Sequence, residues 1–538
     1  MRLLGQVTPV MIALAATVAT AAAAPILLET DQYKRVHVQA LEAVLNGNVE
    51  GAVRALEAYD AAHSDDPETP YLLAIAATKR DDLEGAMAQV REALDRGLDI
   101  GRFLAGPRSL FAKLLETNEF RAMTAERLVE PIHGPMVGSL TDCSARIWVR
   151  TSAVKPVHVL VSRTEDLDDA QRFDADYGES AFHTALADIT GLEPDTRYYY
   201  KVVVADVDGR VHSFKTCPKE GEPATFTIAF GGGAGYVPQH ERMWDTILGF
   251  APLAFLFLGD NVYIDHPTYP EIQEYCYYRR QSRPEFRRFV ASCGISAIYD
   301  DHDFGDNDCW GGPAMDEPNW KRPAWRLFRA NWANPQYGGG DARPGCWFDC
   351  AIADVRFFFL DCRYYRTDPK EPNPSMLGPV QKKWFLDAVT HSNATFNVLA
   401  SSVPWAIGTK PNSLDTWDGY AAEREAIFAA LEAADIGGVI LLSADRHRSD
   451  VWHIERADGY DFYEFESSRL TNQHVHKKIP GADFSYNESQ SFGLLEFDTT
   501  APDPEIAYTI VNIDGERIHT TRLHRSQLMA PAESSTRP

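Results

Sequence analysis

The stretch LAFLFLGDNVYID, residues 253–265, runs from continuous apolar residues directly into carboxylates, an amide and a phenol. Its first six residues have the length and unbroken apolar character of a strand buried on both faces. The polar end presents Asp260, Tyr263 and Asp265. Carboxylates that lose their water are costly unless a positive charge lies among them. An arginine, a solvated turn or a metal ion could meet that need, and the rest of the chain must decide.

Apolar runs of the same kind recur along the second half of the chain, separated by helix-like stretches such as 381–389 and 421–434. The runs are FTIAF (226–230), LAFLFL (253–258), ISAIY (295–299), VRFFFL (355–360), FNVLA (396–400) and GVILL (438–442). Alternation of strand, loop and helix predicts a layered α/β body with helices over a largely buried sheet. In such folds, ligands bind beyond the carboxyl ends of the strands.

Polar residues follow five of these runs at the point where each strand should end. The segments are Gly231–Tyr236, Gly259–Tyr263, Asp300–Asp308, Asp361–Arg363 and Ser443–His447. Any one of them alone is more typical of a solvated turn. Together they place carboxylates, imidazoles, amides and a phenol at one sheet edge, and these are ligands for calcium, iron, zinc or manganese. The convergence predicts a metal site.

The order of these motifs resembles that of the PhoD-like alkaline phosphatases, a branch of the calcineurin-like metallophosphoesterases. The resemblance rests on Gly259-Asp260, Asp301-His302-Asp303 and Asp445-Arg446-His447, and on LDCRYYR (360–366), LGPVQKKWF (377–385) and SSVPW (401–405). It covers residues 131 to about 512. It implies a phosphate ester substrate and two or more bound metal ions.

The resemblance also implies roles for individual residues. Its metal ligands would be Asp260 as a bridge between two cations, Tyr263 as a phenolate, Asp301 and Asn307 on the second cation, and Asp445 and His447 from the last strand. His302 would orient the phosphate or protonate the leaving alkoxide. Arg363 would clamp the phosphate or form a salt bridge to a neighbouring acid. Five further aspartates are expected to support the ligands or the turns: Asp265, Asp300, Asp303, Asp306 and Asp308.

One position departs from the family pattern. Gly232 and Gly233 stand where the family usually has Ser-Cys, and that cysteine ligates ferric iron. The site therefore lacks a thiolate, which weakens the assignment of iron. Calcium is implied by the resemblance, and manganese, magnesium or zinc remain open.

These motifs predict hydrolysis of phosphomonoesters, phosphodiesters or both by direct attack of water, because no Gly-x-Ser-x-Gly nucleophile motif is present. Two alternatives stay open. A purple acid phosphatase-like enzyme combines a fibronectin-like domain with Gly-Asp-x-x-Tyr, but its Gly-Asn-His-Glu and Gly-His-x-His motifs are missing. A non-catalytic exported scaffold could carry a degenerate hydrolase body.

The N-terminal part predicts export and a helical extension. Residues 1–24 have one basic residue, a short apolar stretch and an alanine-rich end, as in a cleaved signal peptide. We expect a periplasmic or secreted protein with no membrane span after cleavage. Within 25–130, VEGAVRALEAYDAA (49–62) and LEGAMAQVREALDR (83–96) repeat at the tetratricopeptide period of 34 residues. Residues 30–128 could bind a protein or peptide partner, or simply cover the main body.

The remaining boundaries follow from changes in pattern. Alternating strands over 131–222 predict a fibronectin III-like sandwich, with LEPDTRYYYKV (192–202) as its tyrosine corner. Residues 223–515 would be the phosphatase domain and 516–538 a C-terminal tail. The net charge of −25 argues against nucleic acid as a partner. Eight cysteines in an exported chain predict disulfides.

Overall fold

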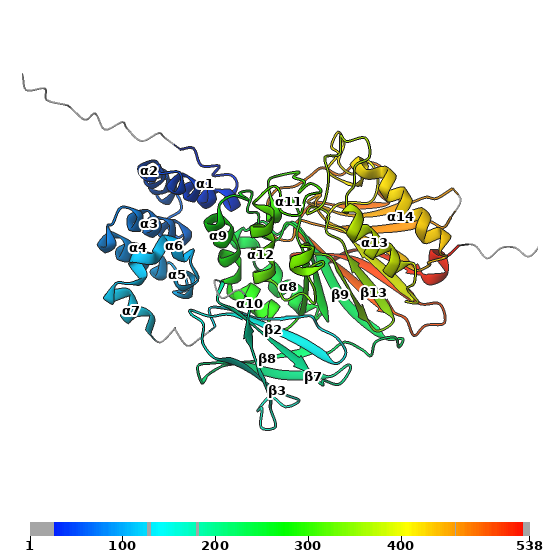
Figure 1. The fold of residues 1–538 in the computed structure, drawn as a ribbon, viewed down its shortest axis with the longest axis horizontal. Helices are drawn as coiled ribbons and strands as arrows, with labels where there is room; N and C mark the ends of the chain where they lie inside the picture. Colours follow the sequence, from blue (N-terminus) through cyan, green and yellow to red (C-terminus); the bar gives the residue numbers. More distant parts are fainter. Residues whose placement is uncertain (1–25, 126–130, 179–181, 458, 531–538) are drawn as a thin grey trace, which may run out of the picture.

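The computed structural model describes residues 26–125, 131–178, 182–457 and 459–530. The predicted signal peptide, residues 1–24, lies outside these residues. A helical segment, a β-sandwich and a layered α/β body follow one another along the chain (Figure 1). No helix in the described ranges is long and apolar enough to cross a membrane.

The helical segment contains two helix pairs at the predicted 34-residue spacing, followed by three shorter helices. Its helices are α1 (Tyr33–Leu45), α2 (Val49–Asp60), α3 (Glu68–Lys79), α4 (Leu83–Asp95), α5 (Gly101–Ala105), α6 (Arg108–Leu115) and α7 (Asn118–Thr124). The second helix of each pair begins with the same cap: Asn48 accepts a hydrogen bond from the Gly51 amide, and Asp82 from the Gly85 amide. The tetratricopeptide assignment itself stays a prediction.

The sandwich comprises β1 (His133–Gly138), β2 (Ser144–Arg150), β3 (Val157–Ser162), β4 (Gln171–Asp174), β5 (Asp176–Tyr177), β6 (Thr184–Thr190), β7 (Arg197–Val204) and β8 (Val207–Lys215). The Tyr198 hydroxyl accepts a hydrogen bond from the Glu193 amide at 2.9 Å, which is the predicted tyrosine-corner contact. One sheet has the order β4-β3-β7-β8. The other continues into the α/β body, because β1 pairs in parallel with β11.

The α/β body is built on two sheets. Its strands are β9 (Thr225–Gly231), β10 (Ala254–Leu258), β11 (Gly294–Ile298), β12 (Phe348–Ile352), β13 (Val355–Phe359), β14 (Phe396–Ala400), β15 (Val439–Ser443), β16 (Ser449–Ile454), β17 (Phe462–Ser467), β18 (Phe484–Tyr486), β19 (Ser491–Asp498), β20 (Glu505–Asn512) and β21 (Arg517–His524). Its helices are α8 (Met243–Gly249), α9 (Pro270–Gln281), α10 (Pro284–Val290), α11 (Asp301–Phe304), α12 (Lys321–Asn331), α13 (Gly378–Val389) and α14 (Ala421–Ala433). All six predicted apolar runs form strands.

The sheet orders show why those runs are apolar throughout. The ten-stranded sheet has the order β21-β20-β19-β9-β10-β11-β1-β2-β6-β5, and the seven-stranded sheet has β12-β13-β14-β15-β17-β16-β18. In β13, Phe357 and Phe359 belong to the core between the sheets, whereas Phe358 packs into the core beneath α13 and α14. Both faces are therefore buried, and alternation of polar and apolar residues disappears.

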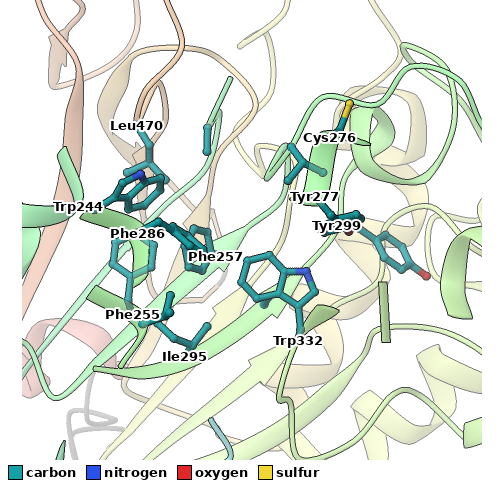
Figure 2. Close-up of a cluster of buried hydrophobic side chains, with 14 of the residues drawn as sticks. Trp244, Phe255, Phe257, Cys276, Tyr277, Phe286, Ile295, Tyr299, Trp332 and Leu470 are labelled. Atoms are coloured by element: carbon teal, nitrogen blue, oxygen red, sulfur yellow. The ribbon is translucent and has the colours of Figure 1, made fainter. Parts of the chain in front are cut away.

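Helices cover the outer face of the ten-stranded sheet near β10. Trp244 of α8 packs against Phe255 of β10, and Phe286 of α10 packs against Phe257 (Figure 2). Trp332, which follows α12, also packs against Phe257. The Trp244 and Phe286 rings meet edge to face with centroids 5.3 Å apart. This packing fixes the strand whose end carries Asp260.

Two predictions need revision. All eight cysteines lie in the described residues and are free thiols, so the expected disulfides are wrong. Seven of the eight are buried or partly buried. The segment predicted as a tail, 516–538, includes β21 and the 3₁₀ helix Arg525–Leu528. Strand β21 pairs along its length with β20 and so belongs to the ten-stranded sheet.

Candidate active site

Polar residues at the carboxyl ends of β10, β11 and β15 meet at one edge of the α/β body. Four of them, Asp260, Tyr263, Asp445 and His447, have φ between 47° and 69°. This left-handed backbone is unusual for residues other than glycine and costs free energy. Such strain concentrates where a backbone must aim side chains into a site.

Asp260, Tyr263 and His447 form a continuous buried chain. The Tyr263 hydroxyl donates to Asp260 Oδ2 at 2.8 Å and lies 2.7 Å from His447 Nε2. The structure thus brings together one predicted ligand from the loop after β10 and one from the loop after β15, 184 positions apart in sequence. All three side chains are almost completely buried.

Asp260 also meets Asp301 and His302, which follow β11. One ligand atom from each of these three residues lies within 4.8 Å of the others. The His302 Nδ1 atom pairs with Asp265, and the Asp301 carboxylate accepts from the His302 and Asp308 amides. Asp260 Oδ1 is buried and has no hydrogen-bond partner among the described residues. An unpartnered buried carboxylate oxygen among carboxylates and imidazole fits a cation, so the donor set is suited to a metal ion.

The protonation of these groups follows from burial and crowding. Burial raises the pKa of Asp260 well above its usual range, and Asp301 and Asp300 raise it further, against the opposing effect of His302. Burial lowers the pKa of His302, but Asp301, Asp265 and Asp260 together raise it well above its usual value. Burial lowers the pKa of His447, so its imidazole is neutral, as a metal ligand requires. Burial and Asp260 raise the pKa of Tyr263, so a phenolate there would need a positive charge beside the oxygen.

Arg363 adopts the salt-bridge alternative. Its side chain is fully buried, with Nε 2.5 Å from Asp300 Oδ1 and Nη1 2.7 Å from Asp415 Oδ1. Nη2 donates to Asp415 Oδ2 at 3.2 Å, and Nη1 also donates to the Cys309 carbonyl. Since all of these donors face the protein, the guanidinium supports the loop after β11. Asp415, which the sequence reasoning missed, is also bound by Arg366 and Lys410.

The remaining predicted residues lie at the margins of the cluster. Asp445 pairs with Arg446 at 3.2 Å and is close enough to Asp300 to raise its pKa. Asn307 is exposed, and within the described ranges no hydrogen bond joins its side chain to the other predicted ligands. Asp303 supports the turn after β10, because its carboxylate accepts from the Asn261 and Val262 amides at 2.9 Å.

Several neighbours of the site were not foreseen from the sequence. Lys34 of α1 places its ammonium 3.7 Å from the centre of the Tyr263 ring. Asn472 accepts from Lys34 Nζ at 3.3 Å and lies 3.5 Å from His447 Nε2. His474 and His476 group with His447, again with one ligand atom of each within 4.8 Å. The His-x-His pair at 474–476 could have been recognised from the sequence as a metal-binding pattern, whereas no feature of the sequence pointed to Lys34.

The glycines after β9 are closely packed and leave no room for side chains. A Cβ on Gly233 would lie 2.7 Å from the Arg469 amide nitrogen and 2.8 Å from Ser468 Oγ, and its φ is +68°. A Cβ on Gly235 would lie 2.7 Å from Asn472 Cγ. The loop is therefore packed too closely against 468–472 to carry larger residues.

A cavity of about 570 Å³ lies elsewhere, between the helical segment, the sandwich and α10. Tyr236, Arg279 and Arg283 line part of it, but none of the predicted ligands does. The predicted ligands and the unpartnered Asp260 Oδ1 instead lie at the carboxylate cluster.

Two packed sheets flanked by helices, with carboxylates and imidazoles at the strand ends, define an α/β metallophosphoesterase-like domain. Residues 228–501, more than half of the chain, match the family described as PhoD-like phosphatase. The chain belongs to this family of phosphoric ester hydrolases. Residues 129–221, which include the sandwich, match a domain of unknown function (DUF7800).

Individual relatives agree with this assignment. The chain is 25% identical over 319 residues to alkaline phosphatase D of Bacillus subtilis (strain 168); the alignment covers 50% of this chain and 54% of the relative. It thus spans about half the length of that protein. The solved structure of PhoD superposes with a TM-score of 0.60 at 18% identity, covering 72% of this chain and 91% of PhoD. A purple acid phosphatase from yellow lupin seeds shares the fold, with a TM-score of 0.55 at 10% identity, covering 76% and 78%.

Proposed function

We propose that the protein is an exported, metal-dependent phosphoesterase that hydrolyses phosphomonoesters, phosphodiesters or both. The observation that carries this proposal is the cluster of Asp260, Asp301 and His302, with the unpartnered Asp260 oxygen buried among them. Membership of the PhoD-like phosphatase family supports the same reaction class.

The residues that would hold metal are Asp260, Tyr263, Asp301, Asp445 and His447, with Asn307 joining only if its loop moves inward. Bound cations would supply Lewis acidity, lowering the pKa of a water molecule and neutralising phosphoryl charge. Asp260 would have an oxygen available for a cation, since one of its oxygens faces Tyr263 and the other has no partner among the described residues. The donors are oxygen and imidazole, which suit calcium, manganese, magnesium or zinc as well as iron.

His302 would act as the general acid. Asp265 holds Nδ1, which leaves Nε2 to donate a proton to the leaving alkoxide. Arg363 would act indirectly, by positioning the loop after β11 through Asp300 and Asp415.

Direct attack by water is supported by the burial and hydrogen bonding of the two nearby serines, which argue against a serine nucleophile. Ser401 Oγ donates to the Val403 carbonyl and Ser402 Oγ donates to Asp300, and both side chains are fully buried. Because neither hydroxyl is exposed, neither is placed to attack a substrate as a nucleophile must.

The test is turnover of p-nitrophenyl phosphate and bis-p-nitrophenyl phosphate before and after exhaustive chelation, with metal content measured in parallel. We expect hydrolysis that disappears on chelation and returns with added divalent metal. Full activity in a verified metal-free sample would overturn the metal dependence. Metal binding without turnover of either ester would favour the scaffold alternative.

Export and partner binding are separate proposals. N-terminal sequencing of exported protein should begin near Ala24 or Pro25, and recovery of Met1 would contradict cleavage. Binding of a protein or peptide through residues 30–128 stays a prediction that pull-down with this segment can test.

A further inference from the structure

The first turn of α1 lies against the candidate active site, beside α9 (Figure 1). The Tyr33 amide donates to Gln473 Oε1 at 3.3 Å, and the Tyr33 and Tyr236 rings are 5.9 Å apart. Arg279 of α9 donates to the Lys34 carbonyl at 3.3 Å. The helical segment is therefore joined to the loops that carry the site.

Buried polar contacts fix this arrangement. Tyr275 of α9 donates to Glu68 of α3 at 2.7 Å. The fully buried Arg102 guanidinium of α5 lies 4.2 Å from the Tyr71 ring centre and 4.9 Å from that of Tyr275. Since buried polar groups must keep their partners, separating the two parts would be costly. The helical segment holds α1 in one position.

This arrangement places the Lys34 ammonium inside the site. Its side chain is 3% exposed, and Nζ reaches the Tyr263 ring and Asn472 Oδ1. Burial lowers the pKa of Lys34 to about 8, whereas Asp265, Asp260 and Asp301 oppose that change. The ammonium therefore lies beside the same residues that form the carboxylate cluster.

Lys34 differs from the other cations around the cluster in its partners. Arg363 and Lys410 are paired with Asp415, Arg446 with Asp445, and Arg35 approaches Asp265. Within the described residues Lys34 forms no such direct ion pair, and its three N–H donors have one hydrogen-bond acceptor, Asn472. It is the cation near the cluster that is most available to an anionic ligand.

We propose that Lys34 binds a non-bridging oxygen of the substrate phosphoryl group, so that the helical segment is a working part of the active site. This inference rests on the proposed phosphoesterase function. A phosphoryl group that approaches Asp260 and Tyr263 would meet the ammonium on the α1 side. In a chain with a net charge of −25, a fixed local cation offsets the repulsion of an anionic substrate. Burial strengthens the interaction, because water does not screen it.

The test compares three full-length proteins: the wild type, Lys34→Met and Lys113→Met. Methionine keeps most of the length and apolar character of the lysine stem and removes the charge. Lys113 lies in the same helical segment and is exposed beside Asp81, so its loss is the matched control. We would measure kcat and KM for p-nitrophenyl phosphate, inhibition by inorganic phosphate, and phosphate binding by calorimetry.

We expect Lys34→Met to weaken phosphate binding by roughly 10- to 100-fold, the effect of losing one charge-assisted hydrogen bond. kcat/KM should fall by a similar factor, with an unchanged melting profile and metal content. Lys113→Met should match the wild type. Equal phosphate affinity in Lys34→Met and wild type would overturn the inference, as would faster turnover in Lys34→Met, which would indicate that the lysine blocks the site.

The calorimetric arm separates this inference from the proposed function. If the wild type hydrolyses neither ester, the proposed function fails. Phosphate binding that depends on Lys34 would then still support an anion site built with α1. If the wild type turns over but phosphate binding ignores Lys34, the function stands and the inference fails.

Discussion

Replacing Arg363 by methionine should destabilise the α/β body rather than selectively weaken substrate binding. The substitution removes the hydrogen bonds to Asp300 and Asp415. Asp415 would still be paired with Arg366 at 3.0 Å and with Lys410 at 3.1 Å. Apart from the backbone amide of its own helix cap, the Asp300 side chain would keep one hydrogen-bond donor among the described residues, the Ser402 hydroxyl. The cost is therefore that of one buried carboxylate left without a cation, about 3–5 kcal/mol. For a domain of roughly 300 residues, that lowers the melting temperature by about 5–8 °C.

The assay is thermal unfolding of Arg363→Met beside the double variant Arg363→Met/Asp300→Asn. Asparagine removes the stranded charge, so the double variant should recover most of the lost stability. A single variant that melts within about 2 °C of wild type but shows a much higher KM would refute this reasoning. Such a result would restore the phosphate-clamp role to Arg363.

Two further substitutions test the loop after β9 and the charge on α9. Gly233→Ala should lower the free energy of unfolding by about 2–4 kcal/mol, because the new Cβ would meet the Arg469 backbone and the residue has positive φ. The control is Gly47→Ala, at φ +83° with open space around it, which should lower the same free energy by only about 1 kcal/mol. Thermal unfolding measures both. Equal losses would show that the loop can yield. Burial raises the pKa of Glu274 to about 7, so the folded state binds its proton more tightly than the unfolded state does. The stability contributed by this proton is present at low pH and is lost as the pH rises towards 7. Glutamine does not titrate, so the free energy of unfolding of Glu274→Gln relative to wild type should increase by about 2 kcal/mol between pH 5 and pH 8. Parallel stability curves for the two proteins across that range would contradict the assignment.

Local patterns predicted the strands and several of the residues that gather in the candidate site. Asp260 and Asp301 follow β10 and β11, which are neighbouring parallel strands of one sheet, so their carboxyl ends share one edge. The meeting of Asp260 with Asp301 therefore follows from the order of motifs along the chain. His447 follows β15 of the other sheet, so its approach depends on how the two sheets pack, which no local pattern predicted. The continuous apolar runs also identified strands buried on both faces.

Long-range contacts were not predictable in this way. Nothing in YKRVHV, residues 33–38, distinguishes Lys34 from a solvated lysine on an amphipathic helix. Its role depends on how α1 docks against α9, which no local pattern encodes. Likewise, the parallel pairing of β1 with β11 joins the sandwich to the larger sheet across more than a hundred residues of chain. The prediction of disulfides from the even number of cysteines was wrong, because that number carries no information about which thiols lie close together.

The most direct test of the central claim is bound metal per chain in wild type and Asp260→Asn, measured by elemental analysis with ester turnover on the same samples. An amide cannot neutralise cations as a carboxylate does. We predict that Asp260→Asn loses most of its metal and retains at most about a hundredth of wild-type turnover, while it remains folded. Wild-type turnover in an Asp260→Asn protein, or a wild type that is active without bound metal, would contradict the account.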